Sequence, residues 1–372
     1  MLLRPGRENE PPRCEATTLG GMENVMEPLR QRSRPVFPRR MAAARRWIIL
    51  AGLTCALPAA AASHPPDSLR SWNGGPAKSA IVQFVRDITT EGGPYYVPPA
   101  GRVVVFSDDG TLSPELPMPA ALAYAADRMK PLLSKHPKWR TKEPFRSAIT
   151  RNAKSLSTAG QRGVLELMGA THAGMTTEEF DLAVAAWLGK TRNPRLNRPY
   201  LLCAYQPMLE LVDYLRGNGF TLFIVARGAA EFSRIWMAKL YGIPPEQVIG
   251  GTARTRYQVR KGAPVLIRRP EFDILESGAG KPAAIYRKIG CRPLAAFGSS
   301  DDDLEMLEWV AGGPGRRLSL IVRHTDGGNE FSYDRKAVFG RLDKALDAAR
   351  KRGWTIVDMT KDWSRVFSKA DR

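Results

Sequence analysis

Residues 102–112 read RVVVFSDDGTL, an unbroken apolar run that ends in a serine, two aspartates and a glycine. A continuous apolar run of this length predicts a strand that is buried on both faces, as in a parallel sheet. Ligand sites of α/β proteins lie outside the carboxyl ends of such strands. We therefore expect a functional site where this strand gives way to Ser107, Asp108 and Asp109.

The rest of the chain alternates between apolar runs and stretches with helical spacing. The alternation predicts an α/β fold, a Rossmann-like doubly wound parallel sheet. We expect further strands at 221–226, 247–249, 294–297, 318–322 and 355–358, and helices at 76–89, 207–218, 231–241, 282–289 and 303–310. Segments 257–259 and 265–267, on either side of Lys261-Gly262-Ala263, predict a hairpin.

Residues 116–200 differ from their surroundings because helical periodicity dominates and no strand is evident. Helices are expected at 120–133, 163–172 and 177–188, the last after the start signal Thr176-Thr177-Glu178-Glu179. This pattern predicts an inserted, all-helical cap at 116–200. The core would then comprise 63–115 and 201–372.

We expect the first 62 residues to lie outside the folded domain. Residues 41–62 have a positive start, a short apolar stretch and a small-residue end, which is typical of a secretory signal peptide cleaved after Ala62. Residues 1–40 read as a disordered leader or as a start placed too early. We expect a periplasmic or secreted protein with no transmembrane segment after signal removal.

The composition is that of a globular protein with an excess of positive charge. Hydrophobic residues make up 43% of the chain and the formal net charge is +19. The excess is typical of an Arg-rich solvated surface, or of a protein that recruits small phosphorylated or anionic molecules. No compact Lys/Arg run is interleaved with aromatics, so specific nucleic-acid binding is not expected. Cys203 and Cys291 remain after signal removal and are expected either as a disulfide or as two buried thiols.

Four loops carry the polar residues of a single site: 106–112, 224–228, 280–282 and 297–303. Carboxylates at strand ends suit Mg²⁺, which prefers oxygen ligands. A nearby lysine, Lys281, would stabilise a transferring phosphoryl group.

In this order the loops resemble the motifs of the haloacid dehalogenase superfamily, in its phosphoserine-phosphatase-like branch with a helical cap. The resemblance covers roughly residues 70–365 and implies Mg²⁺-dependent hydrolysis of a small phosphate ester through an aspartyl-phosphate. It assigns the acid/base role and a metal-binding backbone carbonyl to Asp109 and the phosphate-screening role to Lys281. Metal binding falls on Asp109, Asp301 and Asp303, and substrate binding on Thr111. We also expect Arg227 and Gly228, which follow the second strand, to contact the substrate, because a guanidinium suits bidentate contact with phosphate.

The chain departs from the family pattern at several positions. Ser107 stands where the family has its nucleophilic aspartate, and Ser299 where an Asp or Asn binds metal. Ala226 stands where the family has a hydroxyl, with Arg227 in place of the usual small residue. Asp108 is a poor replacement for the nucleophile, because side chains alternate along a strand and those of residues 107 and 109 share one side. A serine hydroxyl, unlike a carboxylate, needs a base to attack.

Three hypotheses follow. The favoured one is a pseudo-phosphatase with impaired or absent turnover, whose cleft binds an anion through Lys281 and Arg227. The second is an active Mg²⁺-dependent phosphatase in which Ser107 attacks and Asp109 serves as base. The third is a cationic protein that binds polyanions or an envelope partner, with the cleft incidental.

Overall fold

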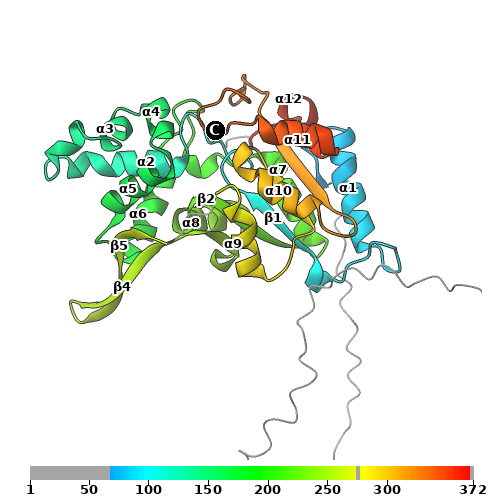
Figure 1. Cartoon of the computed structure of the whole chain (residues 1–372), viewed down its shortest axis with the longest axis horizontal. Coiled ribbons are helices and arrows are strands. Elements are labelled where there is room, and N and C mark those ends of the chain that lie inside the picture. The colour runs from blue at the N-terminus through cyan, green and yellow to red at the C-terminus, as the bar shows by residue number, and fades with distance from the viewer. Residues whose placement is uncertain (1–67, 274–276, 369–372) are drawn as a thin grey trace, which may run out of the picture.

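The computed structural model describes residues 68–273 and 277–368 and contains a six-stranded parallel sheet (Figure 1). The strand order is β3-β2-β1-β6-β7-β8, and all five neighbouring pairs are parallel. The strands are β1 (Val103–Ser107), β2 (Thr221–Ala229), β3 (Val248–Gly251), β6 (Ala295–Gly298), β7 (Leu318–Arg323) and β8 (Thr355–Asp358). The predicted fold class, a doubly wound parallel sheet, is confirmed.

Strand β1 lies in the middle of the sheet, between β2 and β6. All five of its residues are buried, as the apolar run predicted. Its register pairs Ser107 with Val225 and Phe106 with Phe297. The loops that follow β1, β2 and β6 therefore leave the sheet side by side, at its carboxyl edge.

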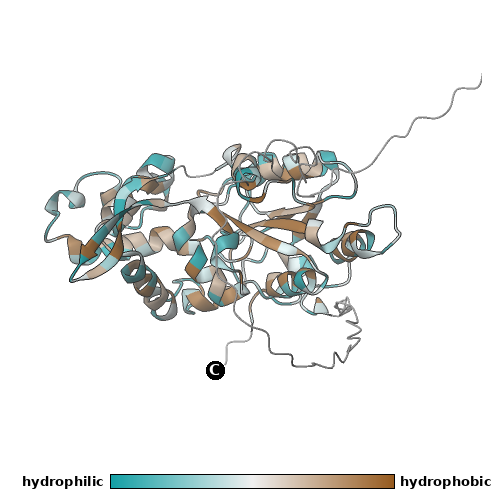
Figure 2. Ribbon diagram, turned by 90° about the horizontal axis from the view of Figure 1, so that it is seen from below, coloured by the Kyte–Doolittle hydropathy of each residue, from teal (hydrophilic) through white to brown (hydrophobic). Residues whose placement is uncertain are grey.

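Alternate residues of β1 point to opposite sides of the sheet, so both faces carry apolar side chains and both are covered by helices. Val104 and Phe106 belong to one apolar cluster with α1, α7 and α8, whereas Val105 belongs to a second cluster with α9, α10 and α11. The bounds are α1 (Pro76–Thr89), α7 (Gln206–Gly217), α8 (Ala230–Tyr241), α9 (Gly280–Ile289), α10 (Leu304–Ala311) and α11 (Lys344–Arg352), with a short α12 (Met359–Asp362) at the end. Figure 2 shows the apolar residues concentrated along the central strands.

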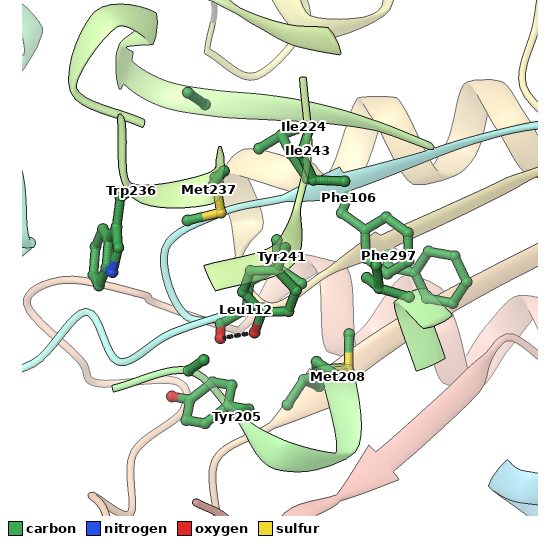
Figure 3. Close-up of a cluster of buried hydrophobic side chains, with 14 of the residues drawn as sticks. Phe106, Leu112, Tyr205, Met208, Ile224, Trp236, Met237, Tyr241, Ile243 and Phe297 are labelled. Carbon is green, nitrogen blue, oxygen red and sulfur yellow. Dashed lines mark hydrogen bonds between the residues drawn. The ribbon is translucent and has the colours of Figure 1, made fainter. Parts of the chain in front are cut away.

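The first cluster packs tightly beneath the site loop. The rings of Phe106 and Phe297 stack with centroids 4.2 Å apart. The Tyr241 hydroxyl donates a hydrogen bond of 2.5 Å to the backbone carbonyl of Leu112, which ties α8 to the chain that follows β1 (Figure 3). These contacts hold the loop after β1 on a rigid support.

Residues 116–200 form helices beside one end of the sheet, on the left of Figure 1. They are α2 (Ala120–Met129), α3 (Phe145–Ile149), α4 (Ala153–Thr158), α5 (Gly160–His172) and α6 (Thr177–Lys190). Thr176 and Glu179 form a reciprocal capping box at the start of α6, as the start signal predicted.

The predicted hairpin forms as β4 (Ala253–Arg260) and β5 (Ala263–Phe272), which pair antiparallel. It packs against this helical group: the backbone N–H of Arg268 donates to Met175 (2.8 Å) and that of Gly174 donates to Arg268 (2.9 Å). The hairpin itself was predicted, but its packing against the helices of residues 116–200 was not indicated by the sequence.

Among the described residues, no helix combines the length and the apolar content that crossing a bilayer requires. The predicted leader and signal peptide lie outside the described residues. Cys203 and Cys291 are not joined in a disulfide; Cys203 is buried, and burial raises the pKa of its thiol to about 12.

Candidate active site

A cavity of about 360 Å³ lies between the carboxyl edge of the sheet and the helices of residues 116–200. Its apolar wall comes mainly from those helices and from the 338–341 loop, and includes Leu122, Leu156, Val164, Met168, Val338 and Phe339. Its polar floor comes from the strand-end loops and includes Asp109, Arg227, Gly228, Ser300, Asp301 and Asp302. The cavity therefore suits a small ligand with one polar end.

The two aspartates after β1 point in different directions. Asp109 lines the cavity. Asp108 turns toward β2 and α8, where its carboxylate accepts hydrogen bonds from the Ser233 hydroxyl (2.7 Å) and from the backbone N–H of Arg227 (3.3 Å). Burial, with Asp108 and Glu115 nearby, raises the pKa of Asp109 well above its usual value despite the opposing charge of Arg227.

Ser107 lies behind the floor of the cavity. Its side chain is 1% exposed and it is not among the described residues that line the cavity. Ala226, beside it on β2, is fully buried and offers no hydroxyl. The end of β1 therefore has no carboxylate at position 107, and β2 has no side-chain hydroxyl at position 226.

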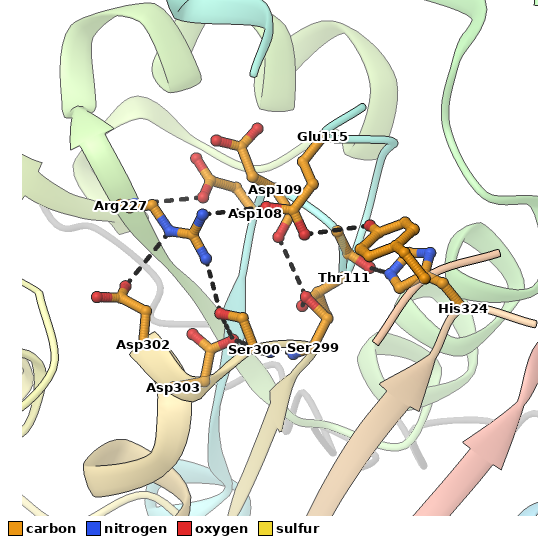
Figure 4. Close-up of polar contacts among 12 residues, drawn as sticks. Asp108, Asp109, Thr111, Glu115, Arg227, Ser299, Ser300, Asp302, Asp303 and His324 are labelled. Atoms are coloured by element: carbon orange, nitrogen blue, oxygen red, sulfur yellow. Dashed lines mark hydrogen bonds and ion pairs between the residues drawn. The ribbon is translucent and has the colours of Figure 1, made fainter. Parts of the chain in front are cut away.

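The guanidinium of Arg227 lies among Glu115, Ser300 and Asp302 (Figure 4). Strand β2 is irregular between Val225 and Ala229, which places Arg227 at the cavity floor. Its guanidinium pairs with Glu115 (3.0 Å) and Asp302 (3.5 Å) and donates to the Ser300 hydroxyl (2.7 Å). Although burial alone would lower the pKa of Arg227, Glu115 and Asp302 raise it, so the side chain keeps its charge.

Glu115 is a site residue that the sequence reasoning missed. It is fully buried, and it accepts hydrogen bonds from Arg227 and from the Tyr333 hydroxyl (3.1 Å). Burial raises the pKa of Glu115, against the opposing effect of Arg227. Gly110 and Gly340, both with positive φ, approach it so closely that a β-carbon at either would collide with its carboxylate. The only signal in the sequence was an acidic residue shortly after the first motif.

A second buried network holds the first loop from the opposite side. One ring nitrogen of His324, Nε2, lies 2.9 Å from the Gly110 carbonyl oxygen, and Nδ1 lies 3.0 Å from Glu330. The Tyr205 hydroxyl also donates to Glu330 (3.1 Å). These contacts fix the turn at Gly110, whose φ is +75°.

Lys281 and Asp303 lie together beneath the cavity, and both are fully buried. The Lys281 ammonium contacts Asp303 (2.6 Å) and Asp302 (2.7 Å). Burial would lower the pKa of Lys281, but these two carboxylates raise it. The predicted phosphate-screening lysine is therefore charged, and its contacts are with the protein itself.

The predicted residues thus divide into two sets. Asp109, Arg227, Gly228 and Asp301 line the cavity, whereas Ser107, Thr111, Lys281 and Asp303 are buried behind it. Asp301 differs from its predicted role as a metal ligand, because its Oδ1 accepts backbone N–H groups of Asp343 (2.8 Å) and Ala345 (2.9 Å) at the start of α11. That carboxylate caps a helix that the sequence did not predict.

The predicted ligands do not fit a Mg²⁺ ion. The Asp109 carbonyl accepts a hydrogen bond from the Ser299 hydroxyl (3.2 Å), and Thr111 donates to the same hydroxyl (3.1 Å). Asp303 uses one oxygen for Lys281 and the other for the backbone N–H groups of Ser299 and Ser300. Within residues 68–273 and 277–368, no group of three or more His, Cys, Asp or Glu side chains is arranged to hold a metal.

No protein-family model and no curated protein matches the chain. Solved structures with a similar fold include a functionally unknown protein from Anaerococcus prevotii (15% identity, 76% of this chain and 91% of that one, TM-score 0.47). They also include a haloacid dehalogenase family hydrolase from Salmonella enterica serovar Typhi (14% identity, 59% of this chain and 62% of that one, TM-score 0.36). A phosphoserine phosphatase in its apo form is a third (15% identity, 59% of this chain and 86% of that one, TM-score 0.30).

Proposed function

We propose that this chain is an exported protein of the haloacid dehalogenase type that binds a small phosphorylated or otherwise anionic ligand and has lost the family's phosphoryl transfer. The observation that carries the proposal is the state of position 107. The residue there is a serine that is 1% exposed and lies behind the cavity floor. An uncharged, covered side chain is a poor nucleophile toward a ligand in the cavity.

The neighbouring carboxylates do not replace the lost nucleophile. Asp108 is turned away and hydrogen-bonded to Ser233 and to the backbone of Arg227. Asp109 faces the cavity, but in the family this position transfers protons rather than forming the covalent intermediate. Covalent catalysis depends so steeply on its nucleophile that this change removes several orders of magnitude in rate.

The cavity still offers a binding site with two kinds of surface. Arg227 is 24% exposed at the floor and Arg341 also lines the cavity, so an anionic group has cations to face. Leu122, Val164 and Phe339 line the opposite wall and would cover an apolar body. Binding sites for small molecules commonly combine an apolar lining with a few polar groups in this way.

Hydrolysis of an aryl phosphate with Mg²⁺ tests the loss of turnover. The wild type should show no release above background, and Asp109→Asn should leave that background unchanged. The triple change Ser107→Asp, Ala226→Ser and Arg227→Gly restores the family pattern at the ends of the first two strands and should create activity. Clear Mg²⁺-dependent release by the wild type that disappears in Asp109→Asn would instead establish the active phosphatase.

Ligand binding and export have separate tests. Thermal shift with inorganic phosphate and with alkyl phosphates of increasing chain length should show stabilisation that grows with the apolar body and weakens in Arg341→Ala. Arg254→Ala, at an exposed arginine of the hairpin, is the matched control. No stabilisation by any of these anions would refute the ligand class. Export predicts that protein recovered from outside the cytoplasm begins at Ser63.

A further inference from the structure

Apart from Asp109, the carboxylates around the site already have positively charged groups or hydrogen-bond donors as partners. Glu115 has Arg227 and Tyr333, and Asp302 has Lys281 and Arg227. Asp303 likewise has Lys281. A divalent ion bound to these groups would have to displace protein cations that are close and largely shielded from water.

The uncharged donors are engaged as well. Ser299 donates its hydroxyl to the Asp109 carbonyl, and Ser300 donates to Asp303 while accepting from Arg227. A neutral serine at position 107 supplies no charge to a metal. Asp301 accepts the backbone N–H groups of Asp343 and Ala345, so among the described residues Asp109 is the one carboxylate at the cavity floor with no hydrogen-bond donor or ion-pair partner. A lone carboxylate holds Mg²⁺ weakly, because this ion exchanges its waters reluctantly.

We infer that the Arg227 guanidinium is the resident cation of this site and that the folded protein uses no divalent metal there. Arginine suits the role because its planar guanidinium stays charged when covered and reaches several oxygens at once. Arg227 does so with Glu115, which follows β1, and with Ser300 and Asp302, which follow β6. The side chain thus clamps the loops after β1 and β6 to strand β2.

This inference deepens the proposed function, since it gives the site a fixed cation, but its test measures metal binding and stability rather than hydrolysis. Titration calorimetry and thermal unfolding with Mg²⁺ and Mn²⁺ are applied to the wild type, Arg227→Gly, Arg227→Lys and the control Arg254→Gly. Arg254 is an exposed arginine that pairs with Asp273.

The wild type and Arg254→Gly should show no binding and no cation-dependent rise in melting temperature. Arg227→Gly should be less stable without metal and should gain stability as the cation concentration rises. Low concentrations of methylguanidine should restore the stability of Arg227→Gly. The stability of Arg227→Lys should lie between those of the wild type and Arg227→Gly. Should Arg227→Gly fail to fold, Arg227→Gly with Glu115→Gln removes the unpaired buried charge and is used instead.

Saturable binding of Mg²⁺ to the wild type would overturn the inference. So would an Arg227→Gly variant, alone or with Glu115→Gln, whose response to metal equals that of the wild type. Either result could occur whether or not the protein hydrolyses phosphate esters, so it is distinct from failure of the proposed function.

A separate observation concerns the β4–β5 hairpin, which projects from the lower left of Figure 1. Tyr257 pairs with Leu266 and Val259 with Pro264, so these four apolar side chains share one face of the two-stranded sheet. Tyr257 and Val259 are 66% and 57% exposed. The opposite face carries Ile267, which is buried against the helical group.

Basic residues surround this apolar face. Residues 253–270 contain five arginines and one lysine, and no acidic residue. Arg268 is buried, and Arg254, Arg260 and Arg269 pair with Asp273, Glu179 and Glu271, whereas Arg256 and Lys261 lie exposed beside the apolar face. A second copy of the chain would bring like charges together, which disfavours self-association through the hairpin. We propose that the hairpin binds an anionic lipid surface, inserting its apolar face at the headgroup level while the basic residues meet the lipid charges.

Co-sedimentation with vesicles tests this interaction, using proteins that share one N terminus. Vesicles of phosphatidylglycerol and phosphatidylcholine should retain the wild type, and vesicles of phosphatidylcholine alone should not. The triple change Tyr257→Ser, Val259→Ser and Leu266→Ser should reduce binding, whereas Leu182→Ser, at an exposed leucine of α6, should not. Equal retention of the triple variant, or a dimer in sedimentation velocity that this variant dissociates, would overturn the proposal.

Discussion

The Ser233 hydroxyl donates a 2.7 Å hydrogen bond to the carboxylate of Asp108, and this contact joins the loop after β1 to helix α8. The other carboxylate oxygen accepts the backbone N–H of Arg227. Asp108 is 4% exposed, so its carboxylate is a structural brace rather than a group available to a ligand.

Asp108→Ala should therefore lower the free energy of unfolding by about 1–3 kcal/mol, because it leaves buried donors without partners. Ser233→Ala should lower it less. In the triple variant that restores the family pattern, Asp108→Asn should leave hydrolysis unchanged. Urea unfolding and the aryl phosphate assay measure the two effects, and loss of the restored activity in Asp108→Asn would show that Asp108 is the nucleophile after all.

Glu115 and Arg227 should behave as a coupled pair. Each single change, Glu115→Gln or Arg227→Gln, should cost about 1–3 kcal/mol, with Arg227 partly exposed to solvent. The double variant should lose less than the sum of the two, since the partner left unpaired in each single variant is then absent. Urea unfolding of the four proteins in the cycle measures the coupling, and strict additivity would mean that the pair contributes nothing.

His172 makes stability depend on pH. Burial, with the positive charges of Arg268 and Arg128, lowers its pKa from 6.5 to about 3. Below pH 6.5 the unfolded chain binds a proton that the folded chain does not, so stability falls as the pH falls from 6.5 toward the folded pKa, by about 1.4 kcal/mol per pH unit.

His172→Phe keeps a ring against Tyr124 and removes the titration. The pH dependence of its unfolding free energy between about pH 6.5 and 5 should be flatter than that of the wild type. His136→Gln, at an exposed histidine, provides the control. Parallel curves for the wild type and His172→Phe would show that the buried ring does not act in this way.

Gly340 should be intolerant of a side chain. Its φ is +66° and a β-carbon would collide with the Glu115 carboxylate, whereas Gly353 has nearly the same φ, +67°, with open space around it. Both alanine variants carry the strain of a positive φ, so the difference between them isolates the collision. Gly340→Ala should lose at least about 1 kcal/mol more than Gly353→Ala in urea unfolding, and equal losses would mean that Glu115 moves aside freely.

Much of the fold could be predicted because it follows from short-range patterns. Strand β1 and helix α1 lie where the apolar run and the helical spacing placed them. Helix α11 escaped prediction because its sequence is mostly charged and only Ala345, Leu346 and Ala349 of its nine residues are buried, which leaves a weak apolar signal. The packing of β5 against α5 and α6 also escaped, because it joins segments about 90 residues apart in the chain, and no local pattern encodes such a contact.

For the candidate site too, part could be predicted from the sequence and part depended on the folded chain. Alternation along a strand set Asp108 apart from Asp109, but it also placed Ser107 beside Asp109 in the pocket, whereas Ser107 lies behind the cavity floor. Residue identity alone revealed that Ser107 and Ala226 break the family pattern. The partners of each charge had to come from the folded chain. Arg227 meets Glu115 across 112 positions of sequence and Tyr333 meets Glu115 across 218. Coulombic and hydrogen-bond energies depend on distances in space, so the assignment of a counter-charge to each buried carboxylate emerges only when the loops are brought together.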